Sequence, residues 1–455
     1  MKGDKKDGIV KNAFILGLGT FIAKLMGAIY RVPLTKIIGS LGLGLYQMVF
    51  PVYALLLDFS GAGAPGALAK IISSFNENKE QRAYDYLKTG YRLLSILGII
   101  FSLLMLFFAK PLARLQGNER AYLGYVFLSP AIFFVCLISC LRGYFQGLMN
   151  MKPVATSQLV EQGVKLILGL IFAYLLKDFT EKAVAGAIFA ITLSEVFAFI
   201  ILYLTFIKRK NDKKLYLTFD KKNIKTQAKQ IVKYAFPIII VGILIPLSQV
   251  IDSFVIVRIL SKYTSSATAL FGLLSGVALT VINLPVSICY GIATVAIPSV
   301  SSGMTIESKE KRCQKLLMLT LIVALPCAIF CYFFSPFIVR VLFNSLPIEE
   351  KAITINLLKI LSPCIVLLSL IQTQNAILIG KNRMYLPSFS LLLGIIFKTA
   401  INVVLLNNPR YNIYGGAFGI IACYFSACLI NLIMIIHLKV KDEYKIIKFK
   451  QLKIE

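Results

Sequence analysis

Two cationic side chains, Lys24 and Arg31, lie inside the first long apolar segment of this sequence. They are seven residues apart, so on an α-helix both point to nearly the same side. Gly27 lies between them and leaves room for close approach to the backbone. An ammonium and a guanidinium group at this spacing suit the oxygens of a diphosphate. The alternative is that Arg31, which is followed by Pro33, lies near the headgroups and extends its charge to them.

The second apolar segment contains a carboxylate followed by the sequence GAGAPG. Asp58 precedes this stretch, in which proline removes a backbone donor and the glycines weaken a helix. We therefore expect this stretch to be a hinge or an unwound segment that lines a cavity. Asp58, beside it, is expected to act in gating or coupling. The hinge residues are Gly61, Gly63, Pro65 and Gly66.

Three more ionisable residues interrupt apolar segments and are candidates for coupling or gating. Glu161 and Lys165 are four residues apart, a spacing at which side chains on a helix meet. We expect them to form a neutralised structural pair, with a cation or proton site as the alternative. Glu195 has no partner in the neighbouring sequence and is a candidate for proton relay.

The composition places these charges in a membrane protein. The 455 residues are 58% hydrophobic and 15% charged, with a mean hydropathy of +0.78, which is too apolar for a soluble globular fold. The apolar runs are long enough for helices to cross a membrane and lack the alternation of barrel strands. The formal charge of +28 fits the basic residues that flank membrane helices, so we expect no nucleic-acid partner.

Dividing the apolar runs at charged and turn-rich breaks predicts an all-α integral membrane protein with about twelve transmembrane helices. The spans centre on 12–38, 42–70, 84–110, 121–147, 153–176, 183–207, 230–258, 267–300, 314–342, 352–379, 385–406 and 413–438. The predicted domains are an N-terminal six-helix bundle at 1–207, a basic cytoplasmic linker at 208–229, a C-terminal six-helix bundle at 230–438 and a basic cytoplasmic tail at 439–455. Lysine and arginine are most numerous in the connections on the side of both termini, so both termini are expected in the cytoplasm.

The two halves share motifs in the same order. Gly147, Pro153, Lys165 and Gly186-Ala187 correspond to Gly380, Pro387, Lys398 and Gly416-Ala417, and Phe107-Phe108 with Arg114 corresponds to Phe333-Phe334 with Arg340. Because an even number of spans separates the copies, they have the same orientation, which is a parallel repeat about an axis along the membrane normal. Such a repeat predicts a cavity between two bundles.

The repeat adds candidates for the lining of this cavity. Asp252 aligns with the region of Arg31 in the first half, and we expect the two to pair when the outer side closes. Lys398, the counterpart of Lys165, would add positive charge to a substrate site, and Gln374 would add a polar group.

No enzyme signature is present, so we expect a non-enzymatic protein without a cofactor. The sequence has no Walker loop and no HExxH, and its single histidine, His437, excludes a Ser/His/Asp set and a histidine metal cluster. Gly39–Gly44, GSLGLG, is expected to be a tight turn rather than a phosphate cradle. Without an ATP site, transport would use an ion gradient, the membrane potential or the substrate's own gradient.

The sequence resembles a known transporter family along essentially its whole length. The resemblance is carried by K-x-x-G-x-x-x-R from Lys24 to Arg31 followed by GLGLYQ, by NLPVSICYGIATVAIPSVSS, by LPCAIFCYFFSPFIVRVLF and by NAILIGKNRMYLPSFSLLLGIIFKTAINVVLL. These motifs are similar to those of the stage V sporulation protein B branch of the multidrug/oligosaccharidyl-lipid/polysaccharide (MOP) exporter superfamily, and to the lipid II flippases.

The resemblance implies a V-shaped, MATE-like transporter that moves an undecaprenyl-diphosphate-linked sugar precursor across the plasma membrane of a bacterium, with Na⁺ or H⁺ as a possible coupling ion. Lys24 stands where the family commonly has an arginine, and the lipid II flippases generally have fourteen spans. The alternatives are a cation-coupled multidrug exporter of the same superfamily and a non-transporting membrane scaffold in cell-envelope or spore assembly.

Overall fold

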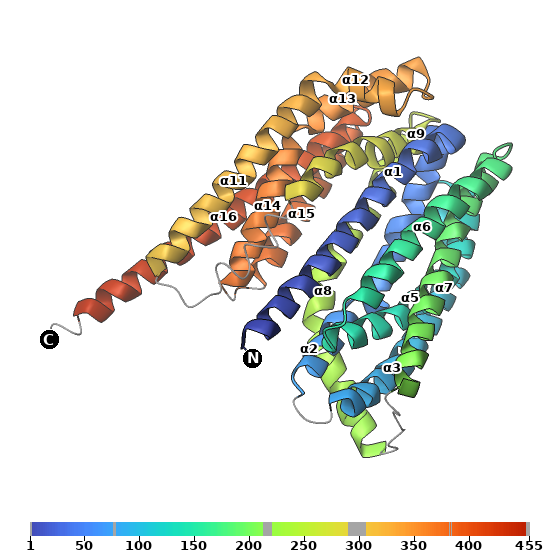
Figure 1. Ribbon diagram of the computed structural model, residues 1–455. Coiled ribbons are helices and arrows are strands. Elements are labelled where there is room, and N and C mark those ends of the chain that lie inside the picture. The colour runs from blue at the N-terminus through green and yellow to red at the C-terminus, as the bar shows by residue number, and fades with distance from the viewer. Residues whose placement is uncertain are drawn as a thin grey trace. The chain divides into compact units, whose positions relative to one another are not determined.

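The computed structural model describes residues 2–75, 79–212, 221–289, 306–381, 383 and 385–451, and the regular structure in these ranges is helical (Figure 1). In the described ranges, eleven helical stretches are long and apolar enough to cross a membrane, judged by length and composition. One of them, Leu25–Ser73, is 49 residues long and covers two of the spans predicted from the sequence. The prediction of an all-α membrane protein with about twelve spans is confirmed.

The chain divides into two compact units, Met1–Phe254 and Val255–Glu455. This division falls within helix α8, Lys221–Leu260, which also contains Pro237 and Pro246. The assignment of two six-helix bundles separated by a linker at 208–229 stays a prediction.

Helix α1, Lys2–Leu57, begins the first unit and is kinked at Gly39, where φ is 66° and ψ is −174°. An α-helix cannot continue through these angles, and residues with a side chain rarely adopt them. Pro33 and Pro51 also lie in α1, and each removes a backbone hydrogen-bond donor. The tight turn expected at Gly39–Gly44 is reduced to its first residue, because two helices meet at the non-helical Gly39 and residues 40–44 are helical.

The second predicted span changes its helical geometry part-way along. Helix α1 passes into the π-helical segment η1, Asp58–Ala62, and helix α2, Ala64–Ser73, follows. Such a π-helical turn has a wider hydrogen-bonding pattern than an α-helix and is frequent at functional sites. Pro65 lies in the first turn of α2, where its missing N–H would have no helical partner.

The other helices that lie wholly in the first unit are α3, Lys79–Phe107, α4, Ala109–Leu115, the 3₁₀ turn η2, Glu119–Ala121, α5, Tyr122–Gly147, α6, Lys152–Leu175, and α7, Thr180–Asp212. Helix α5 packs against α2, α3 and α7, while α6 packs against α7 and α1 (Figure 1). A Cβ atom added at Gly147 would lie 2.6 Å from Cβ of Ile72. Small residues therefore allow close helix contacts, as is usual in membrane bundles.

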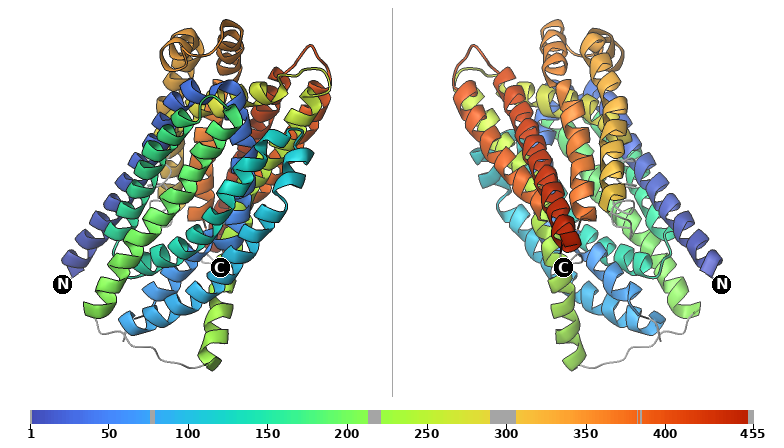
Figure 2. Two further views of the ribbon diagram at one scale, coloured as in Figure 1. Left: turned by 90° about the vertical axis from the view of Figure 1, so that its right-hand side faces the viewer. Right: turned by 90° about the vertical axis from the view of Figure 1, so that its left-hand side faces the viewer.

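The helices of the second unit that follow α8 are α9, Ala267–Phe271, the π-helical η3, Gly272–Ala278, α11, Ile306–Phe333, α12, Ser335–Leu342, α13, Ile348–Leu361, α14, Pro363–Gly380, α15, Leu386–Leu406, and α16, Tyr414–Gln451. Helix α16 packs against both α14 and α15, and α14 packs against α11 (Figure 2, orange to red). A Cβ atom added at Gly394 of α15 would lie 2.8 Å from the carbonyl oxygen of Cys423 in α16. A glycine again permits a close helix contact.

A break of the same kind occurs in both halves of the chain. Helix α3 ends before Phe108, with φ −89° and ψ 5°, and helix α11 ends before Phe334, with φ −95° and ψ 12°. Each phenylalanine is followed by a short helix that carries an arginine, Arg114 in α4 and Arg340 in α12. The repeated motif therefore has the same local conformation in both halves of the chain.

Candidate functional site

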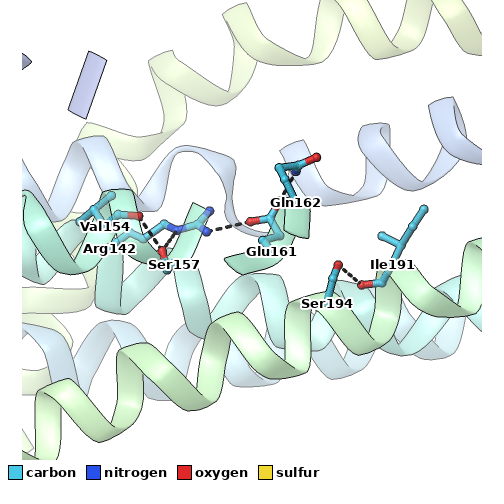
Figure 3. A network of polar contacts seen from close by, with 7 residues as sticks. All are labelled: Arg142, Val154, Ser157, Glu161, Gln162, Ile191 and Ser194. Atoms are coloured by element: carbon cyan, nitrogen blue, oxygen red, sulfur yellow. Dashed lines mark hydrogen bonds and ion pairs between the residues drawn. The ribbon is translucent and has the colours of Figure 1, made fainter. Parts of the chain in front are cut away.

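A polar network joins α5 and α6 in the first unit (Figure 3). Nη2 of Arg142 in α5 lies 2.8 Å from Oε2 of Glu161 in α6, and Nε of Arg142 donates to Oγ of Ser157 at 3.1 Å. The second carboxylate oxygen of Glu161 accepts a hydrogen bond from Nε2 of Gln162 at 2.9 Å. The side chains of Arg142 and Glu161 are only 17% and 18% exposed. Both oxygens of this carboxylate are therefore engaged within the helix bundle.

The ion pair expected between Glu161 and Lys165 is wrong, because the carboxylate pairs with Arg142 of the neighbouring helix. Nζ of Lys165 lies instead 5.8 Å from the ring centroid of Tyr30 and 5.9 Å from that of Phe50. These distances lie at the outer limit of cation–π attraction. Since both rings belong to α1, Lys165 directs its charge from α6 toward the first helix.

A second carboxylate, that of Glu195 in α7, lies near the same network. Glu195 is 6% exposed and interacts electrostatically with Glu161, Arg142 and Lys165. The hydroxyl of Tyr53 in α1 is buried, has no hydrogen-bond partner in the described part of the chain, and also interacts with Glu195. Two carboxylates and two cations thus gather from α5, α6 and α7 beside a tyrosine hydroxyl. Their formal charges cancel.

Helix α1 contacts α6 at Gly27, four residues before Arg31. A Cβ atom added at Gly27 would lie 3.5 Å from Oε1 of Gln162, and the carbonyl of Arg31 accepts a hydrogen bond from Oγ1 of Thr35 at 2.7 Å. Lys24 lies in α1 as well, but its side chain falls outside the described residues. The proposed roles of Lys24 and Arg31 in diphosphate binding stay predictions.

The candidate hinge residues lie at tight helix contacts. A Cβ atom added at Gly61 would lie 3.3 Å from Sγ of Cys136, and one added at Gly63 would lie 2.7 Å from the carbonyl oxygen of Ala235. Gly66 is exposed, and its added Cβ would lie 3.0 Å from Ile238. Close packing therefore explains these glycines as well as flexibility does, and the hinge stays a prediction.

The two aspartates are both half-buried. Asp58 begins η1, and a Cβ atom added at Gly242 of α8 would lie 3.5 Å from its Oδ2 atom. Asp252 lies near the end of the part of α8 that belongs to the first unit. The pairing of Asp252 with Arg31 stays a prediction.

The two candidates in the second unit are deeply buried. Lys398 of α15 is 3% exposed, and Gln374 of α14 is also buried. Nε2 of Gln374 contacts Sγ of Cys428 at 3.6 Å, and its Oε1 atom has no hydrogen-bond partner among the described residues. Nearby, Nδ2 of Asn431 donates to Oδ1 of Asn375 at 2.8 Å. The substrate-binding roles of Lys398 and Gln374 stay predictions.

Arg142 is the site residue that sequence reasoning missed. It is an intramembrane cation at the end of an apolar run, which is a signal of the same kind as Lys24. The nearest carboxylate in the sequence, Glu161, is 19 residues away on another helix, so only the packing of α5 against α6 shows the pair. No group of three or more His, Cys, Asp or Glu residues that could hold a metal ion is found in the described part of the chain.

Comparison with protein-family models identifies the family. Residues 9–304 match the model described as "Polysaccharide biosynthesis protein", which is more than half of the chain. The chain belongs to the polysaccharide biosynthesis protein family. Within the MOP superfamily, this family member is similar to the stage V sporulation protein B and lipid II flippase branch, as its motifs indicate.

Two relatives from Bacillus subtilis (strain 168) match nearly the whole of this polysaccharide biosynthesis family member. Stage V sporulation protein B is 26% identical over 452 residues, covering 96% of this chain and 86% of the relative. The lipid II flippase MurJ is 26% identical over 450 residues, covering 94% of this chain and 82% of the relative.

Solved structures show the same fold. An inward-facing MATE-family multidrug transporter of the MOP superfamily matches with a TM-score of 0.75 and 18% identity, covering 92% of this chain and 96% of the other. The inward-closed lipid II flippase MurJ matches with a TM-score of 0.72 and 15% identity, covering 93% and 87%. The polysaccharide biosynthesis family member is therefore a multi-pass membrane protein with the fold of MOP-superfamily transporters.

Proposed function

We propose that this chain is a non-enzymatic flippase for an undecaprenyl-diphosphate-linked cell-wall or polysaccharide precursor of the lipid II type. It would move this lipid from the cytoplasmic to the outer leaflet of a bacterial plasma membrane by alternating access, with both of its termini in the cytoplasm. Its similarity to the lipid II flippase MurJ supports the class of substrate.

The observation that carries the proposal is the pairing of Glu161 with Arg142. Because this carboxylate pairs with Arg142 of α5, the charge of Lys165 is opposed by Glu195 rather than by Glu161, and its ammonium group lies over two rings of α1. Helix α1 is also the helix that contains Lys24 and Arg31. Cationic groups from two neighbouring helices suit a doubly charged diphosphate, which Arg binds through planar paired hydrogen bonds and Lys as a point charge.

Leaflet-resolved flipping in vesicles tests this function. The purified chain is reconstituted with fluorescent lipid II or with an undecaprenyl-linked polysaccharide precursor, and the lipid remaining in each leaflet is measured. We expect Arg31→Gln and Lys165→Met each to slow flipping by about tenfold or more, which corresponds to a rise of about 1.4 kcal/mol in the activation free energy. The control Arg114→Gln removes an arginine that is 58% exposed and should leave the rate unchanged. If the wild-type chain moves neither lipid, the proposed function is wrong.

We also propose that a proton taken up by Glu195 drives the cycle. The groups that face this carboxylate are Tyr53 from α1, Arg142 from α5, and Glu161 and Lys165 from α6. Among the two carboxylates, Glu161 is held by an arginine and a glutamine, so Glu195 is the better proton acceptor. A Na⁺ ion at the same residues is the alternative.

A pH gradient across the vesicles separates these possibilities. Proton coupling is supported if the flipping rate of the wild type depends on the proton gradient and the flipping rate of Glu195→Gln does not. The control Glu119→Gln changes a carboxylate that is 60% exposed and should retain the dependence. Flipping that follows a sodium gradient at constant pH would support the alternative.

A cation-coupled multidrug exporter is the second candidate function, since the MATE transporter shares the fold. Such a protein needs acidic groups available to a cationic drug; both oxygens of Glu161 are engaged, so Glu195 is the carboxylate of this cluster that remains for such a role. Efflux of a cationic dye from the same vesicles tests this candidate. Movement of neither lipid nor dye would favour a non-transporting scaffold.

A further inference from the structure

A glutamine in the connection after α4 is completely buried. Gln116 is 0% exposed. Its Nε2 atom donates to the carbonyl oxygen of Met48 at 3.0 Å and to Oγ of Ser253 at 2.9 Å, and its Oε1 atom accepts a hydrogen bond from the hydroxyl of Tyr125 at 2.5 Å. The Tyr125 hydroxyl also lies 3.1 Å from the Met48 carbonyl. One side chain thus connects α1, α5 and α8.

This arrangement is specific because each polar atom of the Gln116 side chain has a partner. A buried amide without partners is costly, whereas a fully connected network fixes one relative position of the elements that it joins. Water cannot replace the lost bonds easily in an apolar bundle. The Gln116 network therefore holds Ser253, and with it the neighbouring Asp252, at one position beside α1.

The other end of α8 is also attached to the first unit. Oγ1 of Thr89 in α3 donates to Oε1 of Gln227 at 2.6 Å, and one turn further on the hydroxyl of Tyr86 donates to Oε1 of Gln230. These two hydrogen bonds join α3 to the beginning of α8. Polar contacts thus lie at both ends of the part of α8 that belongs to the first unit.

Close packing joins the middle of α8 to the first unit. Gly63 allows the carbonyl of Ala235 to approach its backbone, and Nζ of Lys70 in α2 lies 4.6 Å from the ring centroid of Tyr234. A Cβ atom at Gly63 would lie 2.7 Å from that carbonyl oxygen, which leaves no room for a larger residue. The attachment of α8 is therefore distributed over its length.

We propose that Gln116 is a positioning residue that fixes the end of this part of α8, and that residues 224–253 move with the first unit during transport. The sequence repeat makes α8 the first helix of the second bundle, so this inference contradicts the simplest reading of the repeat. It follows from contacts within the first unit and does not depend on the identity of the transported lipid.

Distances between spin labels test the proposal in the full-length chain in lipid nanodiscs. The described native cysteines are buried or half-buried, so introduced exposed cysteines react first. One label pair joins Gln249 in α8 to Ile96 in α3, and a second joins Gln249 to Ile348 in α13. The pairs are measured by double electron–electron resonance at several pH values, with and without lipid II.

We expect the Gln249–Ile96 distance to keep a single narrow distribution under all conditions, whatever the second pair does. A Gln249–Ile96 distance that changes with pH or lipid would overturn the proposal, whether or not the Gln249–Ile348 distance changes as well. This readout requires no transport, so a failure to flip lipid II would affect the proposed function alone.

The role of Gln116 is tested with the same label pair. Gln116→Leu removes all three hydrogen bonds and should at least double the width of the Gln249–Ile96 distribution, while Gln146→Leu, a change of a half-buried glutamine in α5, should not alter it. Tyr125→Phe keeps both bonds from Nε2 and should give only a small broadening, and it serves if Gln116→Leu fails to fold. The role is overturned if the distance distribution in Gln116→Leu is as narrow as in the wild type. It is also overturned if the distribution in Tyr125→Phe is as broad as the loss of all three hydrogen bonds predicts.

Discussion

The pair formed by Arg142 and Glu161 leads to a quantitative prediction. Changing Arg142 to Met keeps much of the side-chain volume but leaves the Glu161 carboxylate without its partner at 2.8 Å and Ser157 without the bond at 3.1 Å. Removal of one partner of a buried ion pair costs about 3–5 kcal/mol. Because both side chains are less than a fifth exposed, we expect a value near the lower limit, about 3 kcal/mol.

The double variant separates the pair from its parts. Arg142→Met combined with Glu161→Met removes both charges, so replacement by apolar groups should cost only about 1 kcal/mol. The coupling free energy between the two sites is then about 2 kcal/mol or more, measured by reversible denaturant unfolding in mixed micelles. The exposed pair of Arg120 and Glu181, at 3.2 Å and 59% and 43% exposed, is the control and should couple by less than about 1 kcal/mol.

The result that refutes this reasoning is a coupling no larger than that of the exposed pair. In that case water would reach Arg142 and Glu161 well enough to replace the ion pair, and Glu161 would again be available to Lys165 or to a cation. The argument that Lys165 contributes a cationic group to a diphosphate site would then lose its support.

Two further changes test the packing and the polar contacts of each unit. Gly169→Ala should destabilise the first unit by about 1–3 kcal/mol, because its Cβ would lie 2.5 Å from the buried hydroxyl of Tyr30, and thermal unfolding would show it. An unchanged melting temperature would mean that Tyr30 moves aside without cost. Lys381→Met should lower the free energy of unfolding by about 3 kcal/mol, because it removes the ammonium group that lies 2.5 Å from Oε1 of Glu310 and leaves that carboxylate charged and little exposed. Lys381→Arg should recover part of this stability in the same assay. Equal stability of the Met and Arg variants would contradict the importance of this ion pair.

The membrane class and most of the helices follow from the sequence because hydropathy and charge act locally. A long apolar run between basic connections has few folded alternatives in a bilayer. The same reasoning locates Glu161 as an intramembrane carboxylate. It cannot choose between Lys165, four residues away, and Arg142, which is more distant in the chain, because that choice depends on how α5 and α6 pack.

Helix breaks were harder to predict for a related reason. The sequence LFFAKPL contains Pro111 three residues after Phe108, which is a helix-stop signal, but the conformation of the break is visible only in the backbone angles. The repeat nevertheless marks the position, since Phe334 occupies the corresponding place and has nearly the same conformation. Internal repetition therefore gave information about conformation that residue preferences alone did not.

The kink at Gly39 has a consequence for the handedness of the residue that can occupy it. No atom lies within 4 Å of a Cβ added there, so a side chain would meet no steric obstacle from its neighbours. The restriction comes from φ 66° and ψ −174°, whose mirror image lies close to the polyproline II conformation of ordinary L-amino acids. A D-alanine introduced at this position by chemical synthesis should therefore fit where L-alanine is strained. Glycine serves here because it is achiral, not because it is small.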